Sequence, residues 1–317
     1  MWVVVEGRAH QRRAAVSGEV LARRAARLAH VITLDGAAAA ANEAMTAVAR
    51  DAWWPITDLL QHGGDVAPRV ALVLDPALQH VPFAALPWGP ADSRRVVDVT
   101  ATVRCPSVSA CGSERQVTLT GARVSVLYSD EGGEGLAPLA AARDEAERIG
   151  RRYDGAAVER ATARALREAL AGSAVVHYAG HALADERDPV RSALLLAGED
   201  GAGVRVPLAA VLDAAVRARL VVLSACRTSR AQARRGEGAT GVAGEFLRAG
   251  VDDVVAAQWD VRDDAASELM VHLHEALAAG APPWTALRLA QQRMRADGRR
   301  PARDWAAYVA FTSASQG

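Results

Sequence analysis

The first 65 residues carry the apolar periodicity of helices. Between residues 17 and 62, apolar side chains recur three and four positions apart, so one face of each helix is apolar and the opposite face is polar. Arg23, Arg24 and Arg27 fall on the polar face of the first helix, where arginines are most simply solvated. We predict a mainly helical N-terminal segment over residues 1–65.

After residue 65, short apolar runs alternate with amphipathic stretches. The runs that predict buried strands are 69–74, 96–104, 123–128, 174–178, 193–196, 220–224, 251–258 and 306–311. The stretches that predict helices are 137–151, 161–171, 207–216, 239–249, 263–279 and 283–296. Apolar strands that alternate with amphipathic helices are typical of the α/β class. We therefore predict one domain over residues 66–317, with a mostly parallel sheet and helices on both faces.

Composition excludes several functional classes. The 37 basic and 37 acidic residues among the 317 cancel, so the positive charge of a dedicated nucleic-acid binder is missing. No apolar run approaches the roughly 20 residues that span a bilayer, and no signal-peptide pattern is visible. We expect a cytoplasmic protein without a membrane or nucleic-acid partner.

The three cysteines lack the paired spacing of a metal site. Cys105, Cys111 and Cys226 form an odd set, and in the cytoplasm we expect reduced thiols. His272 and His274 are two apart on a predicted helix and so face different ways. The sequence thus predicts neither a metal nor a cofactor.

Two strands each run into a side chain that can perform chemistry. Ligands of α/β sheets bind beyond the carboxyl ends of the strands, and His181 and Cys226 follow two of the apolar strands. A thiol is a useful nucleophile as the thiolate, and a nearby imidazole can take its proton. From its position alone, a plain buried thiol is the more common role for a cysteine such as Cys226. For His177 we expect a core histidine bonded to the backbone, since its neighbours are apolar.

A glycine motif invites another hypothesis, a dinucleotide-binding enzyme. Residues 236–241 fit the pattern G-x-G-x-x-G, and Asp260 lies near the expected distance for an acid that binds ribose. Such a site needs its glycines directly after a strand, whereas an arginine-rich stretch separates them from Ser224. The same glycines suit a loop that leads into a helix near Thr240.

Several motifs together resemble a known family. They are His-Tyr-Ala-Gly-His at 177–181, Leu-Ser-Ala-Cys at 223–226, Gly-Glu-Gly-Ala-Thr-Gly-Val-Ala at 236–243 and Val-Val-Ala-Ala-Gln-Trp-Asp-Val at 254–261. With Val-Pro-Phe-Ala-Ala-Leu at 81–86 and the closing strand near 305–311, they resemble the CHAT domain over roughly residues 50–317. CHAT domains are caspase-like cysteine peptidases of clan CD, related to separase and often fused to TPR repeats.

The resemblance implies a caspase-like α/β fold and a His-Cys dyad. His181 would be the general acid and base and Cys226 the nucleophile of an acyl-enzyme mechanism. The backbone N–H groups of Cys226 and Ala182 would hold the oxyanion. The sequence departs from the family pattern at two positions. Ala182 stands where the family usually has glycine, and Arg227 stands where the family more often has an acidic residue. An alanine at 182 can donate the same N–H if its φ is negative.

The sequence leaves open whether the substrate would carry a basic or an acidic residue at the cleavage site. Asp260 and Asp263, beside Trp259, are candidates to receive a basic side chain at the cleavage site. Asp264 is a further candidate, but for Asp263 and Asp264 we favour a structural role in the first turn of the helix predicted over 263–279, where acidic residues stabilise the helix dipole. Alternatively, the arginines of residues 227–235 receive an acidic side chain.

Two functional hypotheses follow from the resemblance. The first is a cysteine endopeptidase that cleaves a protein partner, in a bacterial defence or cell-death system, and that responds to an activating protein or TPR module. The second is a catalytically silent caspase-like module that binds peptides or signals, which the departure at Ala182 would favour.

Overall fold

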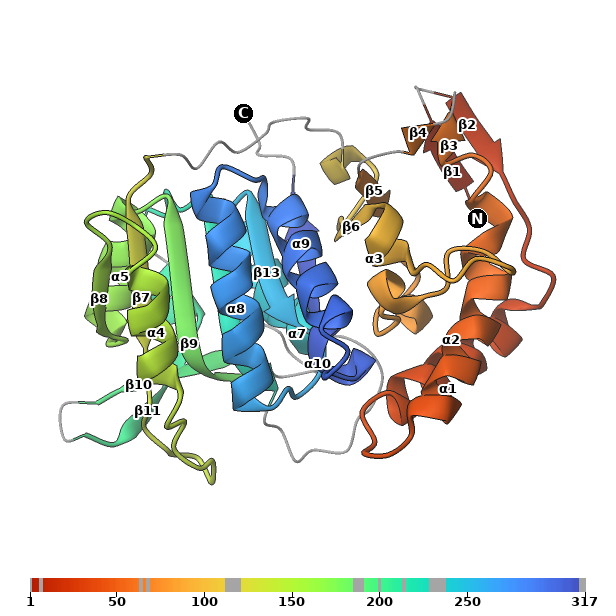
Figure 1. The fold of residues 1–317 in the computed structure, drawn as a ribbon. Coiled ribbons are helices and arrows are strands. Elements are labelled where there is room, and N and C mark those ends of the chain that lie inside the picture. Colours follow the sequence, from red (N-terminus) through yellow and green to blue (C-terminus); the bar gives the residue numbers. More distant parts are fainter. Residues whose placement is uncertain are drawn as a thin grey trace.

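A ten-stranded sheet forms the centre of the computed structural model (Figure 1), which describes residues 2–5, 8–62, 65–66, 69–111, 121–184, 191–198, 201–212, 215–227 and 238–313. The strands pair in the order β11-β10-β9-β12-β13-β14-β6-β5, and β7 pairs with β9 and β8. Their bounds are β5 Arg69–Leu72, β6 Ala101–Arg104, β7 Val124–Tyr128, β8 Ala157–Arg160, β9 Val175–Leu183, β10 Ala193–Ala197, β11 Gly203–Pro207, β12 Leu220–Arg227, β13 Asp253–Ala257 and β14 Tyr308–Thr312. Strands β8, β7, β9, β12 and β13 are mutually parallel, whereas β10, β11 and the β13–β14 pair introduce antiparallel contacts. The predicted α/β class with a mostly parallel sheet is confirmed.

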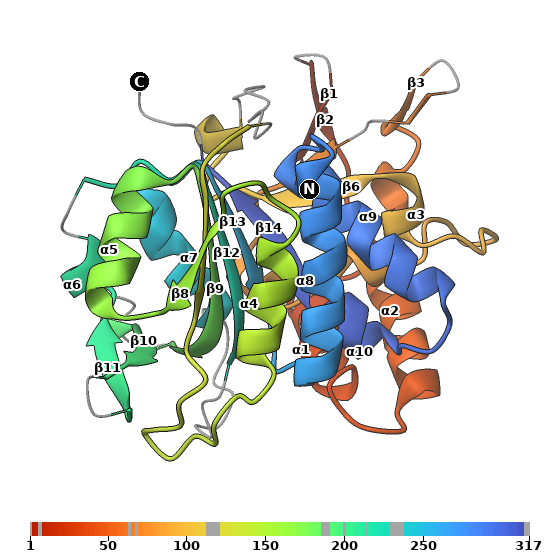
Figure 2. The ribbon, with the colours of Figure 1, turned by 60° about the vertical axis from the view of Figure 1, so that its left-hand side comes forward.

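Helices cover both faces of the sheet (Figure 2), as the alternating pattern predicts. One face packs under α4 (Ala142–Gly150), α8 (Asp263–Ala278) and α9 (Pro283–Ala296), and the other under α5 (Ala163–Gly172), α6 (Ala209–Leu212) and α7 (Gly238–Arg248). Each face has its own apolar cluster, because successive residues of a strand point to opposite sides. The last helix, α10 (Ala302–Trp305), leads into β14.

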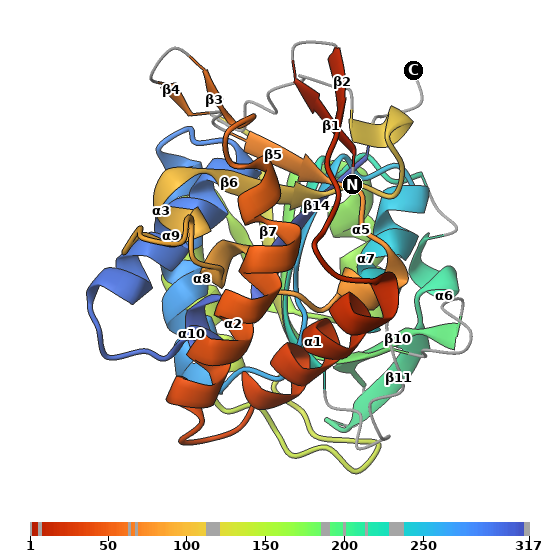
Figure 3. The same ribbon diagram turned by 90° about the vertical axis from the view of Figure 1, so that its right-hand side faces the viewer.

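The N-terminal helices lie against one end of the sheet (Figure 3). Helix α1 (Gly18–Val31) begins after Ser17, whose hydroxyl accepts from the backbone N–H of Val20, and α2 (Ala38–Ala52) packs against it. Their buried residues belong to the same apolar cluster as those of α8 and β14. Two short hairpins join this region, β1 (Trp2–Val5) with β2 (Arg8–Gln11) and β3 (Gln61–His62) with β4 (Asp65–Val66). A domain boundary at 65/66 stays a prediction.

Three local expectations were wrong. Residues 96–104 form helix α3 (Val96–Val99) followed by the short strand β6, in place of one long strand. Strands β8 and β11 were not predicted, because both are short and largely exposed. Within the predicted helical stretch 207–216, the described helix α6 covers Ala209–Leu212, whereas Pro207 belongs to β11.

The cysteines also differ from expectation. A disulfide bond joins Cys105 and Cys111, with 5.5 Å between their Cα atoms, so these two thiols are not reduced in the structure. They are six positions apart in the chain, and the turn that contains the short 3-10 helix Ser109–Cys111 brings them together. Cys226 is therefore the one cysteine of the sequence outside this bond.

A membrane span is absent from the helices that the structure describes, since none is both long and apolar enough to cross a bilayer.

Candidate active site

The structure brings His181 and Cys226 to adjacent strands. β9 and β12 are parallel neighbours in the middle of the sheet, and their register pairs the Cα position of His181 with that of Cys226. Neighbouring strands lie about 4.8 Å apart, so the two Cα positions are side by side in the sheet. Both positions fall at the carboxyl ends of their strands, where α/β sheets bind ligands.

His181 is buried, and one of its ring nitrogens makes a hydrogen bond that orients the ring. His181 lies on β9 and is 3% exposed. Nε2 lies 2.8 Å from the carbonyl oxygen of Ala137. Because a carbonyl only accepts, Nε2 carries the proton, and Nδ1 of the neutral ring is then the free base. Nδ1 is buried and has no hydrogen-bond partner among the described residues.

Tyr178 and Gly180 fix the backbone of His181. The Tyr178 hydroxyl lies 2.7 Å from the carbonyl oxygen of Leu195 and 3.2 Å from that of His181. Its ring folds beneath Gly180, where an added Cβ would lie 2.3 Å from the tyrosine oxygen. The motif His-Tyr-Ala-Gly-His therefore needs its glycine because the tyrosine fills the place of a side chain.

Ala182 meets the backbone condition for an N–H donor. Within the described residues, Glu134 is the one non-glycine residue with a positive φ, so Ala182 is unstrained. Its Cα position pairs with Leu194 of β10 and Arg227 of β12. Its role as oxyanion donor stays a prediction.

The three residues predicted to bind substrate occupy different environments. Trp259 is 7% exposed, and its indole N–H donates to the carbonyl oxygen of Arg303 at 2.8 Å, so its ring belongs to the core. Asp260 is exposed directly after it. Asp263 is exposed in the first turn of α8. Partial burial raises the pKa of its carboxyl, while His181 nearby acts to lower it and Glu145 to raise it. Contact of these residues with a substrate stays a prediction.

Asp264 is clearly structural. Arg300 and Arg262 hold its carboxylate, with oxygen–nitrogen distances of 2.7 and 3.1 Å, and these bonds lower its pKa to about 2. Both Asp263 and Asp264 lie in the first turn of α8, as the predicted helix-charging role requires.

Two sequence motifs fall largely outside the described residues. Of the arginine-rich stretch 227–235, the structure describes Arg227 alone, and the glycine motif 236–241 is described from Gly238, where α7 begins. The helix start predicted near Thr240 agrees with this position.

The expected backbone bond of His177 is wrong. His177 is fully buried, but its Nε2 lies 3.0 Å from Oε1 of Glu145, and its Nδ1 lies 3.1 Å from Nε2 of His274. Sequence reasoning missed Glu145, although a signal exists: it occupies an apolar-face position of α4 with Ala142, Ala146 and Ile149. Despite this grouping, the described part of the chain holds no set of three or more side chains placed to bind a metal ion.

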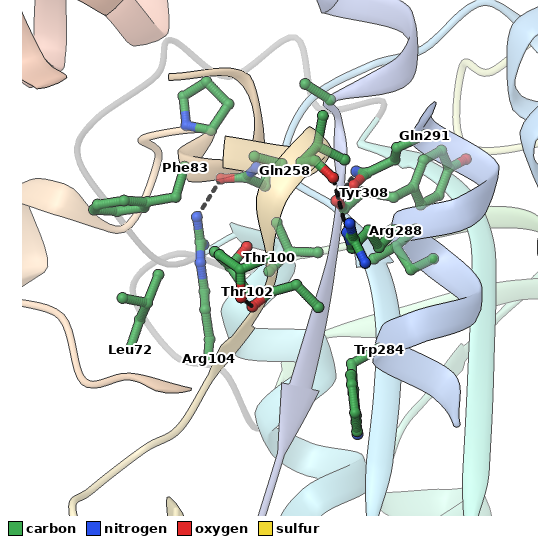
Figure 4. A pocket seen from close by; sticks show the side chains of 17 residues that line it. Leu72, Phe83, Thr100, Thr102, Arg104, Gln258, Trp284, Arg288, Gln291 and Tyr308 are labelled. Atoms are coloured by element: carbon green, nitrogen blue, oxygen red, sulfur yellow. Dashed lines mark hydrogen bonds between the residues drawn. The ribbon is translucent and has the colours of Figure 1, made fainter. Parts of the chain in front are cut away.

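A separate pocket lies between β6, β14 and α9 (Figure 4). The Arg104 guanidinium enters it and donates to the carbonyl oxygen of Val81 at 3.0 Å and to Oε1 of Gln258 at 2.5 Å. Burial lowers the pKa of Arg104 to about 9, so it remains a cation at neutral pH. Arg104 thus ties the segment 79–81 to the residue that precedes Trp259.

Comparison with solved structures identifies proteins with a similar fold. The Saccharomyces cerevisiae separase–securin complex matches with a TM-score of 0.51 and 17% identity, over 78% of this chain and 16% of that chain. The Arg-specific cysteine proteinase gingipain R matches with a TM-score of 0.49 and 12% identity, over 94% and 74% of the two chains. A complex of the pro- and mature domains of Porphyromonas gingivalis RgpB gives a TM-score of 0.44 at 10% identity, over 82% and 68%. The fold is that of the caspase-like cysteine peptidases, and this chain corresponds to a small part of the separase chain.

The family follows from the sequence comparison. The model of the CHAT domain matches residues 42–313, and the chain belongs to the CHAT domain family. No curated protein matches the chain.

Proposed function

We propose that this protein is a cysteine endopeptidase whose dyad is His181 and Cys226. The observation that carries the proposal is the register of β9 and β12, which pairs the two residues across adjacent strands. The caspase-like fold and CHAT membership give the class of protein, and the free Nδ1 of His181 gives the base.

The geometry of His181 suits acid–base chemistry. Nδ1 would accept the Cys226 thiol proton, and the thiolate would attack the peptide carbonyl carbon to form a tetrahedral intermediate. Nδ1–H would then give the proton to the leaving amine, and water would hydrolyse the acyl-enzyme. The bond from Nε2–H to Ala137 holds the ring through both steps, and Asp263 adds a negative charge near the imidazolium.

The backbone N–H groups of Cys226 and Ala182 would hold the oxyanion. Negative φ at Ala182 supports this role, since an alanine there keeps the strand geometry without strain. A silent binding module is the second candidate, favoured by alanine where the family usually has glycine.

The substrate would be a protein with a basic residue at the cleavage site. Asp260 and Asp263 lie exposed at the carboxyl end of the sheet, close in the chain to Trp259. An exposed carboxylate there can bind arginine or lysine through charge-assisted hydrogen bonds. We further propose a cytoplasmic role in bacterial defence or cell death, with activation by a protein partner.

The test is covalent labelling by peptide chloromethyl ketones with arginine or aspartate at the reactive position. Intact mass is measured for the wild type, Cys226→Ala, His181→Ala and the matched control His272→Ala. We expect one adduct on the wild type and the control, none on Cys226→Ala, and labelling of His181→Ala slowed by about 10²-fold or more. Faster labelling by the arginine peptide supports the basic preference, and faster labelling by the aspartate peptide contradicts it. No adduct with either peptide would favour the silent module.

A further inference from the structure

A continuous chain of buried polar groups runs beneath the proposed dyad. Tyr153 Oη lies 2.8 Å from Nδ1 of His274, whose Nε2 lies 3.1 Å from Nδ1 of His177. Nε2 of His177 lies 3.0 Å from Oε1 of Glu145, and Ser224 acts to lower the pKa of the same carboxyl group. These five side chains come from four places in the fold: α4 and the turn after it, β9, α8 and β12.

Burial keeps the interior of the chain uncharged at neutral pH. His177 and His274 are fully buried and Glu145 is 4% exposed. Burial raises the pKa of Glu145 to about 8, although Ser224 and Arg148 act to lower it, and Asp144 raises it further. Burial lowers the pKa of His177 to about 3 and that of His274 well below its ordinary value. Asp263 completes the charged groups around Glu145.

Two proton arrangements satisfy every atom of this chain. In the first arrangement Glu145 is protonated, and its O–H donates to His177 Nε2. His177 Nδ1–H then donates to His274 Nε2, and His274 Nδ1–H donates to the Tyr153 oxygen. The Tyr153 hydroxyl in turn donates to the His274 carbonyl oxygen, 3.4 Å away. With Glu145 ionised, every bond reverses: Tyr153 donates to His274 Nδ1, His274 Nε2–H to His177 Nδ1, and His177 Nε2–H to the carboxylate.

The ends of the chain lie in different environments. Ser224 is two residues before Cys226 on β12, and His177 is four residues before His181 on β9. Asp263 interacts electrostatically with both His181 and Glu145. Tyr153, at the other end, is partly exposed beyond the C-terminus of α4.

We infer that Tyr153, His274, His177 and Glu145 form a proton relay, and that Glu145 is a positioning residue whose charge controls the reactivity of Cys226. The link to catalysis rests on the proposed peptidase function. In one full transfer the Glu145 proton moves to His177 Nε2, the His177 Nδ1 proton to His274 Nε2, and the His274 Nδ1 proton to Tyr153, which releases its own proton to water. The net result is that Glu145 loses one proton and the solvent gains one. The carboxylate left beneath the site disfavours a second anion at Cys226.

The relay is tested first by nitrogen-15 NMR of the histidine rings between pH 6 and pH 9.5. His177 and His274 are assigned from the signals lost in His177→Asn and His274→Asn. In the wild type we expect His177 to change from the Nδ1–H to the Nε2–H tautomer near pH 8, where Glu145 ionises. Glu145→Gln keeps a donor to His177 but cannot ionise, so it should hold the Nδ1–H form throughout. A His177 tautomer that does not change with pH, or that changes identically in Glu145→Gln, overturns the relay.

The effect on the site is tested by the rate at which iodoacetamide alkylates Cys226, located by peptide mapping. The ratio of the Glu145→Gln rate to the wild-type rate should be near one at pH 6.5 and rise about threefold by pH 9, because only the wild type gains the carboxylate. Asp144→Asn removes an exposed carboxyl from the same helix and should follow the wild type. A ratio that stays constant with pH overturns the control of Cys226 by Glu145.

Neither measurement requires peptide cleavage. If the peptide electrophiles fail to label Cys226 while the tautomer change and the rising ratio are observed, the peptidase proposal fails and the relay stands. If the electrophiles label Cys226 while His177 keeps one tautomer, the peptidase proposal stands and the relay fails.

Discussion

The two faces of the central sheet differ sharply in what they bury. Under α5 and α7, β9 and β12 contribute Val176, Tyr178, Val221 and Leu223 to an apolar cluster. Under α4 and α8, alternate positions of the same strands place His177 and Ser224 among apolar neighbours, with Glu145 and His274 packed over them. Successive residues of a strand point to opposite faces of the sheet. Neighbouring residues of β9 and β12 therefore lie in different environments, one apolar and one polar.

We interpret the apolar face as the main source of stability and the polar face as the one that carries chemistry. Apolar burial stabilises without direction, in proportion to the area removed from water. A buried carboxyl and two buried imidazoles cost desolvation free energy that hydrogen bonds offset only when every partner is present. The polar groups lie on the face whose residues lead to His181, and we interpret that placement as functional.

The largest expected effect lies on the apolar face. Phe246→Ala in α7 removes a fully buried ring from the cluster, and we expect it to lower the free energy of unfolding by about 3–5 kcal/mol. Urea denaturation measures the change, with Leu289→Ala, 44% exposed, as the control expected to stay within about 0.5 kcal/mol. A loss at Phe246 no greater than in the control would refute the assignment of this face as the apolar core.

On the polar face, His177→Ala should cost about 2–3 kcal/mol, because it leaves the Glu145 carboxyl and His274 Nε2 buried without their partner. Urea denaturation at pH 6.5 measures it. His272→Ala, on the partly exposed side of α8, serves as the control and should cost under about 1 kcal/mol. Equal losses in the two variants would mean that the buried chain adds nothing beyond packing.

The polar face should also make stability depend on pH. Glu145 has a pKa of about 8 when folded, above its ordinary 4.5, so between these values the folded state binds the extra proton and stability falls as pH rises. His177, with a pKa of about 3, has the opposite slope below its ordinary 6.5, so Glu145 dominates between pH 6.5 and 8. The wild type should lose up to about 2 kcal/mol over that range relative to Glu145→Gln. Parallel pH profiles of unfolding free energy for the two proteins would contradict the raised pKa.

The smallest expected effect is that of removing the Tyr178 hydroxyl, a polar group on the apolar face. Tyr178→Phe removes the hydroxyl that contacts the Leu195 and His181 carbonyl oxygens, and should cost about 1 kcal/mol because the ring remains packed. Chloromethyl ketone labelling of Cys226 should also slow, since the His181 backbone loses this contact. Unchanged stability together with unchanged labelling would show that the hydroxyl is dispensable to the site.

Periodicity located the main strands and helices but failed where the pattern is ambiguous. Val96–Val99 has the β-branched residues of a strand, yet it is helical. The Asp98 carboxyl accepts from the N–H of Arg95 at 2.7 Å, and Arg288 and Gln292 of α9 bind the helix carbonyl oxygens. These distant contacts outweigh local propensity. Edge strands β8 and β11 escaped prediction because their pairing, and not an apolar pattern, defines them.

The amino-acid sequence was enough to predict the α/β class, the apolar strands that lead to His181 and Cys226, and the family, because these depend on local pattern and on motifs within short segments. Only the tertiary structure decided that His177 meets Glu145 and His274, that Ala137 fixes the His181 tautomer, and that Cys105 bonds to Cys111. Glu145 and His177 are 32 residues apart, and His177 and His274 are 97 apart. Hydrogen bonds require donor and acceptor about 3 Å apart at a suitable angle, and no local pattern specifies that for residues brought together by packing.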